Sequence, residues 1–294
     1  MPKVVVCPVI FKSIYLLGAG TIASALLTHL AIHKGVVCAL LYREPKLSTF
    51  GYLAEKNGYA CQRIDCPHAL KSFLSGLEQP SLVISANNLY LFPPSVVDNP
   101  NIQIMNFHNS LLPKHMGVNA PSWAIFDQDA TTGITWHWVT KEVDRGNILG
   151  QKEIPLCGTE NALTLAQKLM QVGADLFAEL VTPLLAGQLA SSPMRVLGER
   201  QMHLQRDVPN DGLLDMAWSG GKMYAFLRAM DWGRAGLFPA PRLVLHGLEY
   251  TISKYRVRLT SVTTEPHILA VGNTVHIAKD GHDFMLHLSP FCPC

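Results

Sequence analysis

The sequence predicts an α/β fold, in which an open, Rossmann-like, mostly parallel sheet precedes a smaller β-rich (OB-like) C-terminal domain. Short apolar runs alternate with amphipathic stretches through the first two thirds of the 294 residues, a pattern typical of parallel strands covered by helices on both faces. After residue 187 the sequence loses its helical periodicity and contains Ser, Pro and Asn. It then shows short runs of alternating apolar and polar residues, which are typical of strands. We therefore expect a main domain over residues 1–190, a linker over 191–212 and a small β-rich domain over 213–294.

Each expected element follows from its local pattern of apolar residues. β-rich apolar runs predict strands at 14–17, 36–42, 82–85, 102–107 and 134–139. Helical periodicity between and after them predicts helices at 21–33, 47–57, 67–77, 120–126 and 162–185. In the last part we expect a helix at 220–230 and strands at 242–245, 250–257, 274–278 and 284–288.

Composition and charge exclude several classes of protein. The net charge of +2 is small and the Lys and Arg side chains are scattered, whereas tight phosphate binding usually shows a concentrated basic stripe, so we do not expect nucleic acid as a partner. No apolar run approaches the roughly 20 residues of a membrane helix, and the N-terminus lacks a signal-peptide pattern. The seven cysteines form no zinc-ligand spacing. We expect a soluble, cytoplasmic protein with reduced thiols and no metal.

A glycine motif near the N-terminus has two interpretations. The sequence Gly18-Ala19-Gly20-Thr21-Ile22-Ala23 matches the G-x-G-x-x-A dinucleotide fingerprint, and Glu44 stands where a ribose-binding acid is expected. One interpretation is an NAD(P)-binding oxidoreductase with the pyrophosphate at the helix N-terminus. The other is a tight first turn of the kind that any open α/β sheet favours. The motif alone leaves both open, and the central segment makes the dinucleotide the weaker one.

The central segment carries a combination of side chains suited to acyl transfer. Asn106 and His108 follow an apolar run, two residues apart, so both can face the cleft at the carboxyl edge of the sheet. Asp144 lies in a loop after the next expected strand. The Asn106 amide can donate to a developing oxyanion, and His108 can shuttle protons. Asp144 can hold the imidazole and raise its pKa, or order a water that relays protons.

Plainer interpretations of the same residues remain at this point. An isolated Asn-x-His pair is common, and an Asp before a glycine-containing loop is usually a turn residue. His137 and Trp138 on the adjacent strand could belong equally to the core or to the surface. Spacing alone therefore does not decide between a catalytic set and a structural one.

The surrounding motifs resemble those of the folate-dependent formyltransferases, a family that includes glycinamide ribonucleotide, methionyl-tRNA and amino-sugar formyltransferases. The similar pieces are Asn106 to Pro113, Gly117, Trp123 to Ile125, Thr132 to Thr135, and Asp144 to Leu149, in that order and spacing. The resemblance covers residues 13–190 and continues more weakly through 214–218. It implies an enzyme that moves a formyl group from 10-formyltetrahydrofolate to an amine without a metal.

The resemblance also implies roles for individual residues. Asn106, His108 and Asp144 would be catalytic. The folate would lie against residues of two loops, namely Asn88, Leu89, Tyr90, Leu91 and Phe92 in the first and Val139, Thr140, Lys141 and Glu142 in the second. The amine would meet Ser110, Met116, Gly117, Asn119 and Trp123.

The amine acceptor is predicted from departures from the family pattern. The tRNA enzymes carry a long basic insertion after the second strand, whereas residues 43–50 here are short and nearly neutral. The loop around Gly117, Asn119 and Trp123 and the later 228–242 segment look like those of specialised-pathway members. We therefore expect an amino-acid-like acceptor, free or held on a carrier protein, as in natural product (non-ribosomal peptide type) biosynthesis. An amino sugar comes next, followed by methionyl-tRNA.

Overall fold

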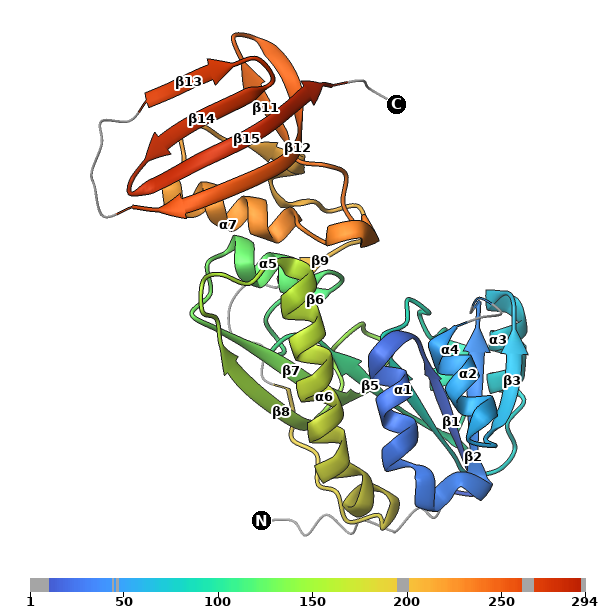
Figure 1. The fold of residues 1–294 in the computed structure, drawn as a ribbon. Helices are drawn as coiled ribbons and strands as arrows, with labels where there is room; N and C mark the ends of the chain where they lie inside the picture. The colour runs from blue at the N-terminus through green and yellow to red at the C-terminus, as the bar shows by residue number, and fades with distance from the viewer. Residues whose placement is uncertain (1–10, 44, 46–47, 195–200, 261–266, 292–294) are drawn as a thin grey trace. The chain divides into compact units, whose positions relative to one another are not determined.

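The computed structural model describes residues 11–43, 45, 48–194, 201–260 and 267–291 (Figure 1). The chain forms two compact units. The first comprises Met1–Gly117, Gly133–Ile154 and Gln167–Met202, and the second comprises Val118–Thr132, Pro155–Ala166 and His203–Cys294. The units interleave along the chain, so neither is one continuous segment. The assignment of the catalytic role to residues 1–190, with a linker at 191–212, stays a prediction.

A seven-stranded sheet forms the centre of the first unit. Its strand order is β3-β2-β1-β4-β5-β7-β8. The strands are β1 (Ser13–Gly18), β2 (Val37–Tyr42), β3 (Ala60–Ile64), β4 (Ser81–Ala86), β5 (Ile102–His108), β7 (Thr131–Trp138) and β8 (Ile148–Pro155). Strands β1 to β5 pair in parallel, whereas β7 runs antiparallel to β5. The predicted open, mostly parallel sheet is confirmed.

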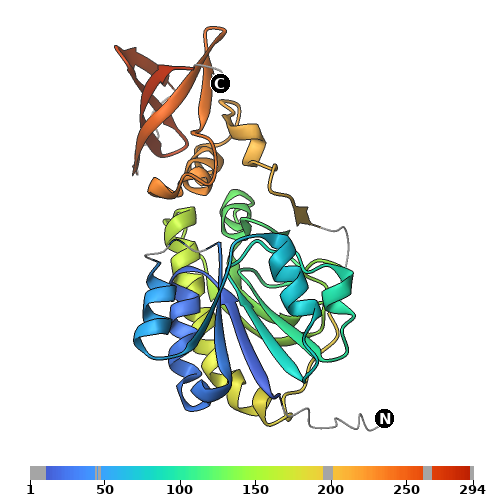
Figure 2. The same cartoon turned by 90° about the vertical axis from the view of Figure 1, so that its right-hand side faces the viewer.

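Helices cover both faces of this sheet (Figure 2). They are α1 (Gly20–His29), the 3₁₀ turn η1 (Ala31–Val36), α2 (Thr49–Lys56), α3 (Pro67–Ser75), α4 (Pro94–Val97) and α6 (Ala162–Leu185). Helices α1 and α6 lie on one face, and α3 and α4 lie on the other. Local signals set the starts: the Ser48 hydroxyl accepts from Gly51 N, and Pro67 occupies the first turn of α3.

Two apolar layers hold the helices against the sheet. On the α3 and α4 face, a cluster of buried residues that includes Leu17, Leu70 and Ile104 joins the strands to both helices. On the α6 face, Trp136 packs between Phe107 and Phe177, with ring centroids 5.5 and 5.4 Å away. Side chains alternate between the two faces along a strand. The residues next to Phe107 and Trp136 in the sequence, among them Asn106, His108 and His137, therefore point to the opposite face.

The second unit is β-rich, as predicted. Its six-stranded sheet has the order β10-β11-β12-β15-β14-β13. The strands are β10 (Leu213–Leu214), β11 (Arg242–Leu245), β12 (Leu248–Leu259), β13 (His267–Val271), β14 (Thr274–Lys279) and β15 (His282–Pro290). Outside both large sheets, the short strand β6 (Met116–Gly117) of the first unit pairs with β9 (Met202–His203). Helices α5 (Ala120–Phe126) and α7 (Gly220–Met230) and the turns η2 (Pro209–Gly212) and η3 (Gly233–Ala235) complete the described elements.

Aromatic contacts join α5 to α7 within this unit. The rings of Phe126, Trp218 and Phe226 contact one another, with centroids 5.6 to 6.3 Å apart. The indole nitrogen of Trp232 donates to the hydroxyl of Ser122 on α5, 3.0 Å away, in a buried contact. The start of α5 is thus fixed by contacts with the C-terminal elements.

The structure differs from the predicted elements where strands lie at edges. The predicted helices at 120–126, 162–185 and 220–230 and the strand at 242–245 have the observed bounds. Strands β3, β8 and β13 were missed: β3 and β13 are largely exposed edge strands, and β8 is interrupted by Gly150 and a Lys-Glu pair. The first helix ends at His29 instead of residue 33, because the chain tightens into η1. None of the described helices has both the length and the apolar character needed to span a bilayer.

Candidate active site

Strand pairing brings the candidate catalytic residues together at one edge of the first sheet. Asn106 pairs with Ser85 of the parallel strand β4 on one side and with His137 of the antiparallel strand β7 on the other. His108, two residues further, pairs with Thr135. This is the carboxyl edge of the parallel strands, where open α/β sheets bind ligands.

The loop after β7 carries Asp144 into this edge. Asp144 has a positive φ of 52°, which Asp tolerates better than most residues, and its side chain is buried. Its carboxylate oxygen Oδ2 accepts a 2.8 Å hydrogen bond from Gly117 N. Two residues later, a Cβ added to Gly146 would lie 1.6 Å from the Trp138 carbonyl oxygen, so only glycine allows the loop to pass this close to the strand.

His108 is buried between the Asp144 carboxylate and a backbone carbonyl. Its Nε2 lies 2.8 Å from the His115 carbonyl oxygen, which can only accept, so Nε2 carries a hydrogen. In the neutral ring the lone pair is therefore on Nδ1, which lies 3.6 Å from Asp144 Oδ2. A proton that His108 takes up goes to Nδ1, beside the carboxylate.

The pKa directions at this pair follow from burial and mutual charge. Burial lowers the pKa of His108 below its ordinary value, and the opposing influences of Asp144 and the His115 carbonyl are smaller. The sequence-based expectation that Asp144 raises the His108 pKa is therefore right for that interaction but wrong for the net shift. Burial by itself raises the pKa of Asp144, but His108, His137 and the Gly117 N–H outweigh it, so the net pKa is lowered. At neutral pH the pair consists of a neutral imidazole and a carboxylate.

A fourth polar side chain, His137, completes the cluster. Its Nε2 lies 3.3 Å from Asn106 Nδ2 and 3.5 Å from Asp144 Oδ1. The sequence left His137 undecided between core and surface, because Trp136 and Trp138 flank it without showing which face points to the sheet edge. Its position is determined by the pairing of β7 with β5, which is a long-range contact that local sequence does not show.

The two loops predicted to bind the folate meet at one apolar cluster. Tyr90, Phe92 and Val139 all pack against the α3 and α4 face of the sheet. Between them, Leu89 and Leu91 are 77% and 71% exposed, so their apolar side chains are free to cover a bound molecule.

The remaining residues predicted to bind the folate form hydrogen bonds or ion pairs with nearby side chains and backbone groups of the protein. Asn88 donates to Ser85, Lys141 forms an ion pair with Asp98, Thr140 donates to the Glu142 carbonyl, and Glu142 pairs with Arg145.

The residues predicted to meet the amine divide between the units. In the first unit, Gly117 contacts the Asp144 carboxylate, Met116 is fully buried, and the buried Ser110 hydroxyl donates to the Lys114 carbonyl. In the second unit, Trp123 stacks on His203 with ring centroids 4.1 Å apart. Among the described residues, the Nε1 of Trp123 and the Nδ2 of Asn119 are buried donors without a hydrogen-bond partner.

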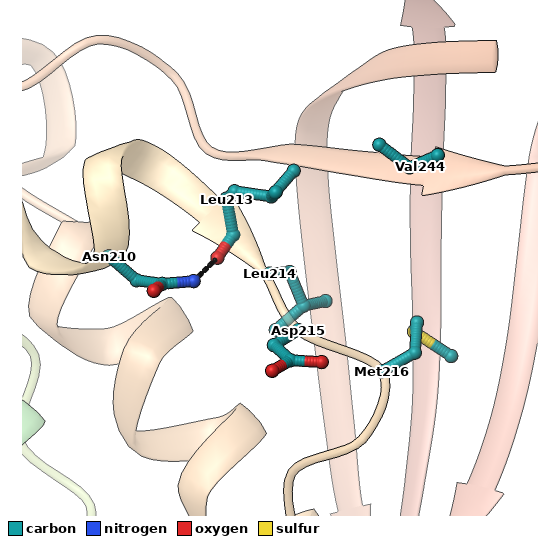
Figure 3. A pocket seen from close by; sticks show the side chains of 6 residues that line it. All are labelled: Asn210, Leu213, Leu214, Asp215, Met216 and Val244. Carbon is teal, nitrogen blue, oxygen red and sulfur yellow. Dashed lines mark hydrogen bonds between the residues drawn. The ribbon is translucent and has the colours of Figure 1, made fainter. Parts of the chain in front are cut away.

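Other candidate sites can be placed in the same way. A Cβ at Gly18 would lie 2.3 Å from the Ala86 carbonyl oxygen, so close packing alone explains why a glycine stands at this position. Glu44 lies outside the described residues. In the part of the chain that the structure describes, no three His, Cys, Asp or Glu side chains gather as metal ligands. A hollow of about 450 Å³ in the second unit is lined by Asn210, Leu213, Leu214, Asp215, Met216 and Val244, and it contains none of the predicted site residues (Figure 3).

Part of the chain matches a known protein family. Residues 53–181 match the model of the formyl transferase family. A methionyl-tRNA formyltransferase of Phocaeicola vulgatus is 31% identical over 145 residues, covering 48% of this chain and 44% of that protein. One of Bacillus subtilis is 27% identical over 204 residues, covering 69% and 60%. The chain thus matches less than two thirds of the length of these relatives.

Solved structures resemble the fold over a longer stretch. An N-formyltransferase from Helicobacter canadensis, solved with folinic acid and dTDP-3-aminofucose, gives a TM-score of 0.76 at 15% identity, covering 95% of this chain and all of that one. A 4-N formyltransferase from Francisella tularensis gives a TM-score of 0.66 at 19% identity, covering 83% and 97%. The resemblance to the formyltransferases that the motifs predict is confirmed over residues 53–181, and the solved structures support the fold.

Proposed function

We propose that the protein transfers a formyl group from 10-formyltetrahydrofolate to a primary amine. The observation that carries the proposal is the cluster of Asn106, His108 and Asp144 at the carboxyl edge of the sheet. In this cluster His108 Nδ1 faces the Asp144 carboxylate, which also accepts from Gly117 N. The match of residues 53–181 to the formyl transferase family supports the same chemistry.

Each residue has a role that its surroundings suit. The co-substrate supplies an activated formyl group whose oxygen gains negative charge when the amine attacks its carbon. The half-exposed Asn106 amide donates an N–H to that oxygen. The lone pair on His108 Nδ1 accepts the proton that the attacking amine must lose, and the imidazole then returns it to the leaving nitrogen. Asp144 stabilises the imidazolium between these two transfers.

The chain offers apolar walls that fit a pterin. Leu89 and Leu91 extend from the loop after β4, and Tyr90, Phe92 and Val139 provide the packed base beneath them. These residues, with Asn88 and 140–142, would hold the folate. Substituting the exposed leucines would then raise the KM for the folate more than it changes kcat, because they bind the co-substrate away from the reacting atoms.

The acceptor is proposed as a small amine. The sequence-based choice is an amino-acid-like amine, free or on a carrier protein, and it depends on the Gly117, Asn119 and Trp123 loop. The buried donors of Asn119 and Trp123 suit a ligand rich in acceptor oxygens. None of the relatives and structures named above is described as acting on a carrier-bound amine.

A nucleotide-linked amino sugar is the second candidate. It is favoured by the likeness to the Helicobacter canadensis enzyme, which extends over 95% of this chain and therefore includes the second unit. A charged tRNA is the third, because the curated relatives named above are methionyl-tRNA formyltransferases.

A formylation assay against an acceptor panel tests the proposal. Purified protein is incubated with 10-formyltetrahydrofolate and an aminoacyl carrier protein, a free amino acid, a dTDP-amino sugar or methionyl-tRNA, and the formylated product is identified by mass. We expect turnover with one small amine, and loss of turnover in His108→Ala. Formylation of the tRNA alone would contradict the small-amine acceptor.

The alternative from another class is an NAD(P)-binding oxidoreductase built on the Gly18 turn. It predicts a saturable change in NAD(P)H fluorescence on addition of the protein. We expect no such change, because close packing against Ala86 already accounts for Gly18.

A further inference from the structure

We propose that Ser85 and Asn88 are positioning residues that fix the direction of the catalytic amide of Asn106. The inference rests on the proposed function, because it concerns which end of that amide faces the formyl oxygen. The residues form a continuous chain of hydrogen bonds from the backbone of Tyr90 to the backbone of Trp138, through Asn88, Ser85, Asn106 and His137.

The direction of each bond is set at the Tyr90 end by a group that can only donate. Tyr90 N–H lies 2.8 Å from Asn88 Oδ1, so this atom is the carbonyl oxygen of the amide. Asn88 Nδ2 then faces the Ser85 hydroxyl oxygen, 2.6 Å away, and donates to it. The Ser85 proton is left for Asn106 Oδ1, also 2.6 Å away.

The opposite end of the chain fits the same direction when the His137 ring is neutral. His137 Nδ1 lies 2.8 Å from the Trp138 carbonyl oxygen, which can only accept, so Nδ1 carries the hydrogen of the neutral ring. Nε2 of the neutral ring then offers a lone pair to Asn106 Nδ2, 3.3 Å away, although the Asp144 Oδ1 atom also lies 3.5 Å from it. The Tyr90 end therefore places the Asn106 oxygen toward Ser85 and its NH₂ group toward His137, and the neutral His137 ring accepts this direction.

The reversed amide would be disfavoured at both ends and unable to assist the reaction. Its NH₂ group would donate to Ser85 and leave the buried hydroxyl proton without an acceptor, because Asn88 also presents a donor there. Its carbonyl oxygen would face the lone pair of His137 and the formyl oxygen. An amide oxygen in that position repels the charge that the NH₂ group stabilises.

Asn88→Asp reverses the polarity of the chain at nearly constant shape. The new carboxylate still accepts from Tyr90 N but cannot donate, so Ser85 turns its proton toward residue 88 and accepts from Asn106 instead. We expect kcat to fall about 100-fold, as for loss of an oxyanion donor. Asn88→Ala removes the side chain but leaves the Ser85 proton available to Asn106, and we expect a loss of kcat of only about threefold, at the lower end of what one hydrogen bond is worth.

A double variant separates this mechanism from simple damage. Ser85→Ala removes the link, and we expect kcat to fall about 10-fold, consistent with one lost hydrogen bond. In Ser85→Ala/Asn88→Asp the reversed polarity no longer reaches Asn106, so kcat should recover to the level of Ser85→Ala alone. Multiplicative losses in the double variant, or an Asn88→Ala loss as large as that of Asn88→Asp, would overturn the proposal.

A spectroscopic readout tests the chain independently of formyl transfer. In protein labelled with ¹⁵N-histidine, the His137 signals, identified by their absence in His137→Gln, should report a hydrogen on Nδ1 and none on Nε2. Asn88→Asp should place a hydrogen on Nε2, because the Asn106 oxygen then faces it. An unchanged His137 pattern refutes the positioning role. A changed pattern in a protein that formylates no acceptor refutes the proposed function and leaves the chain of hydrogen bonds intact.

Discussion

Asn106 on β5 and His137 on β7 lie directly opposite each other across an antiparallel pair, with Asn106 Nδ2 3.3 Å from His137 Nε2. The contact connects the end of β5, the last parallel strand, to the antiparallel strand β7. It therefore links the parallel and antiparallel parts of the sheet at the proposed reaction site. It leaves the second amide hydrogen of Asn106 available to a substrate.

Asn106→Asp should abolish most of the turnover while preserving the fold. The carboxylate has the shape of the amide but places a negative oxygen where a donor is needed, so we expect kcat to fall by at least about 100-fold. Steady-state kinetics and the thermal midpoint measure the two effects. Asn57→Asp on the exposed end of α2 is the matched control and should keep full activity. Equal activity of the two variants would exclude Asn106 from catalysis.

The pH profile of kcat/KM should have its acid limb below the ordinary pKa of histidine, about 6.5. Burial lowers the pKa of His108, so the imidazole remains a base at mildly acidic pH. Asp144→Asn removes a charge that raises this pKa, and the limb should therefore move to still lower pH as kcat falls. A limb that moves upward in Asp144→Asn would contradict the assignment of His108 as the titrating base.

Folding stability should decrease as the pH falls from 7 toward 5. The pKa of His108 is lower in the folded than in the unfolded protein, so the unfolded chain takes up a proton first, and stability is lost below about pH 6.5. The lowered pKa of Asp144 adds a further loss below about pH 4. His108→Gln should flatten the dependence between pH 7 and 5 in thermal unfolding. The exposed His68→Gln is the control, and an equal flattening there would contradict the argument.

Gly146→Ala should destabilise the first unit and displace Asp144. The new Cβ would lie 1.6 Å from the Trp138 carbonyl oxygen, and because the obstacle is backbone it cannot rotate away. We expect a loss of roughly 3 kcal/mol in denaturant unfolding. Gly35→Ala, where a Cβ meets nothing within 4 Å, should change little. Comparable stabilities for the two variants would show that the loop can take another path.

The sequence predicted the parts of the site that depend on local order along the chain. Asn106 and His108 end an apolar run in the parallel sheet, and that position alone placed them at the ligand-binding edge. The helices at 120–126 and 162–185 were predicted at their observed bounds because their apolar periodicity is sustained. These features need no knowledge of distant contacts.

What the sequence could not predict depends on pairing between distant strands. His137 has indoles on both sides, so its facing was fixed only by the register of β7 on β5. The net lowering of the His108 pKa also could not be predicted, because it comes from burial in the folded protein. The interleaving of the two units could not be predicted for the same reason, because it depends on the packing of α5 on α7, about a hundred residues later in the chain.

The antiparallel pairing of β7 also determines which sequence changes the site can survive. Because side chains alternate, a slip of one residue between β7 and β5 would bring an indole opposite Asn106 and turn His137 to the other face. Trp136 opposes that slip, since its Nε1 donates to the Gly173 carbonyl of α6 and its ring is enclosed by Phe107 and Phe177. An apolar side chain on the far face of the sheet thus keeps the polar face in register, and insertions or deletions within β7 should be far less tolerated than changes in the loop before it.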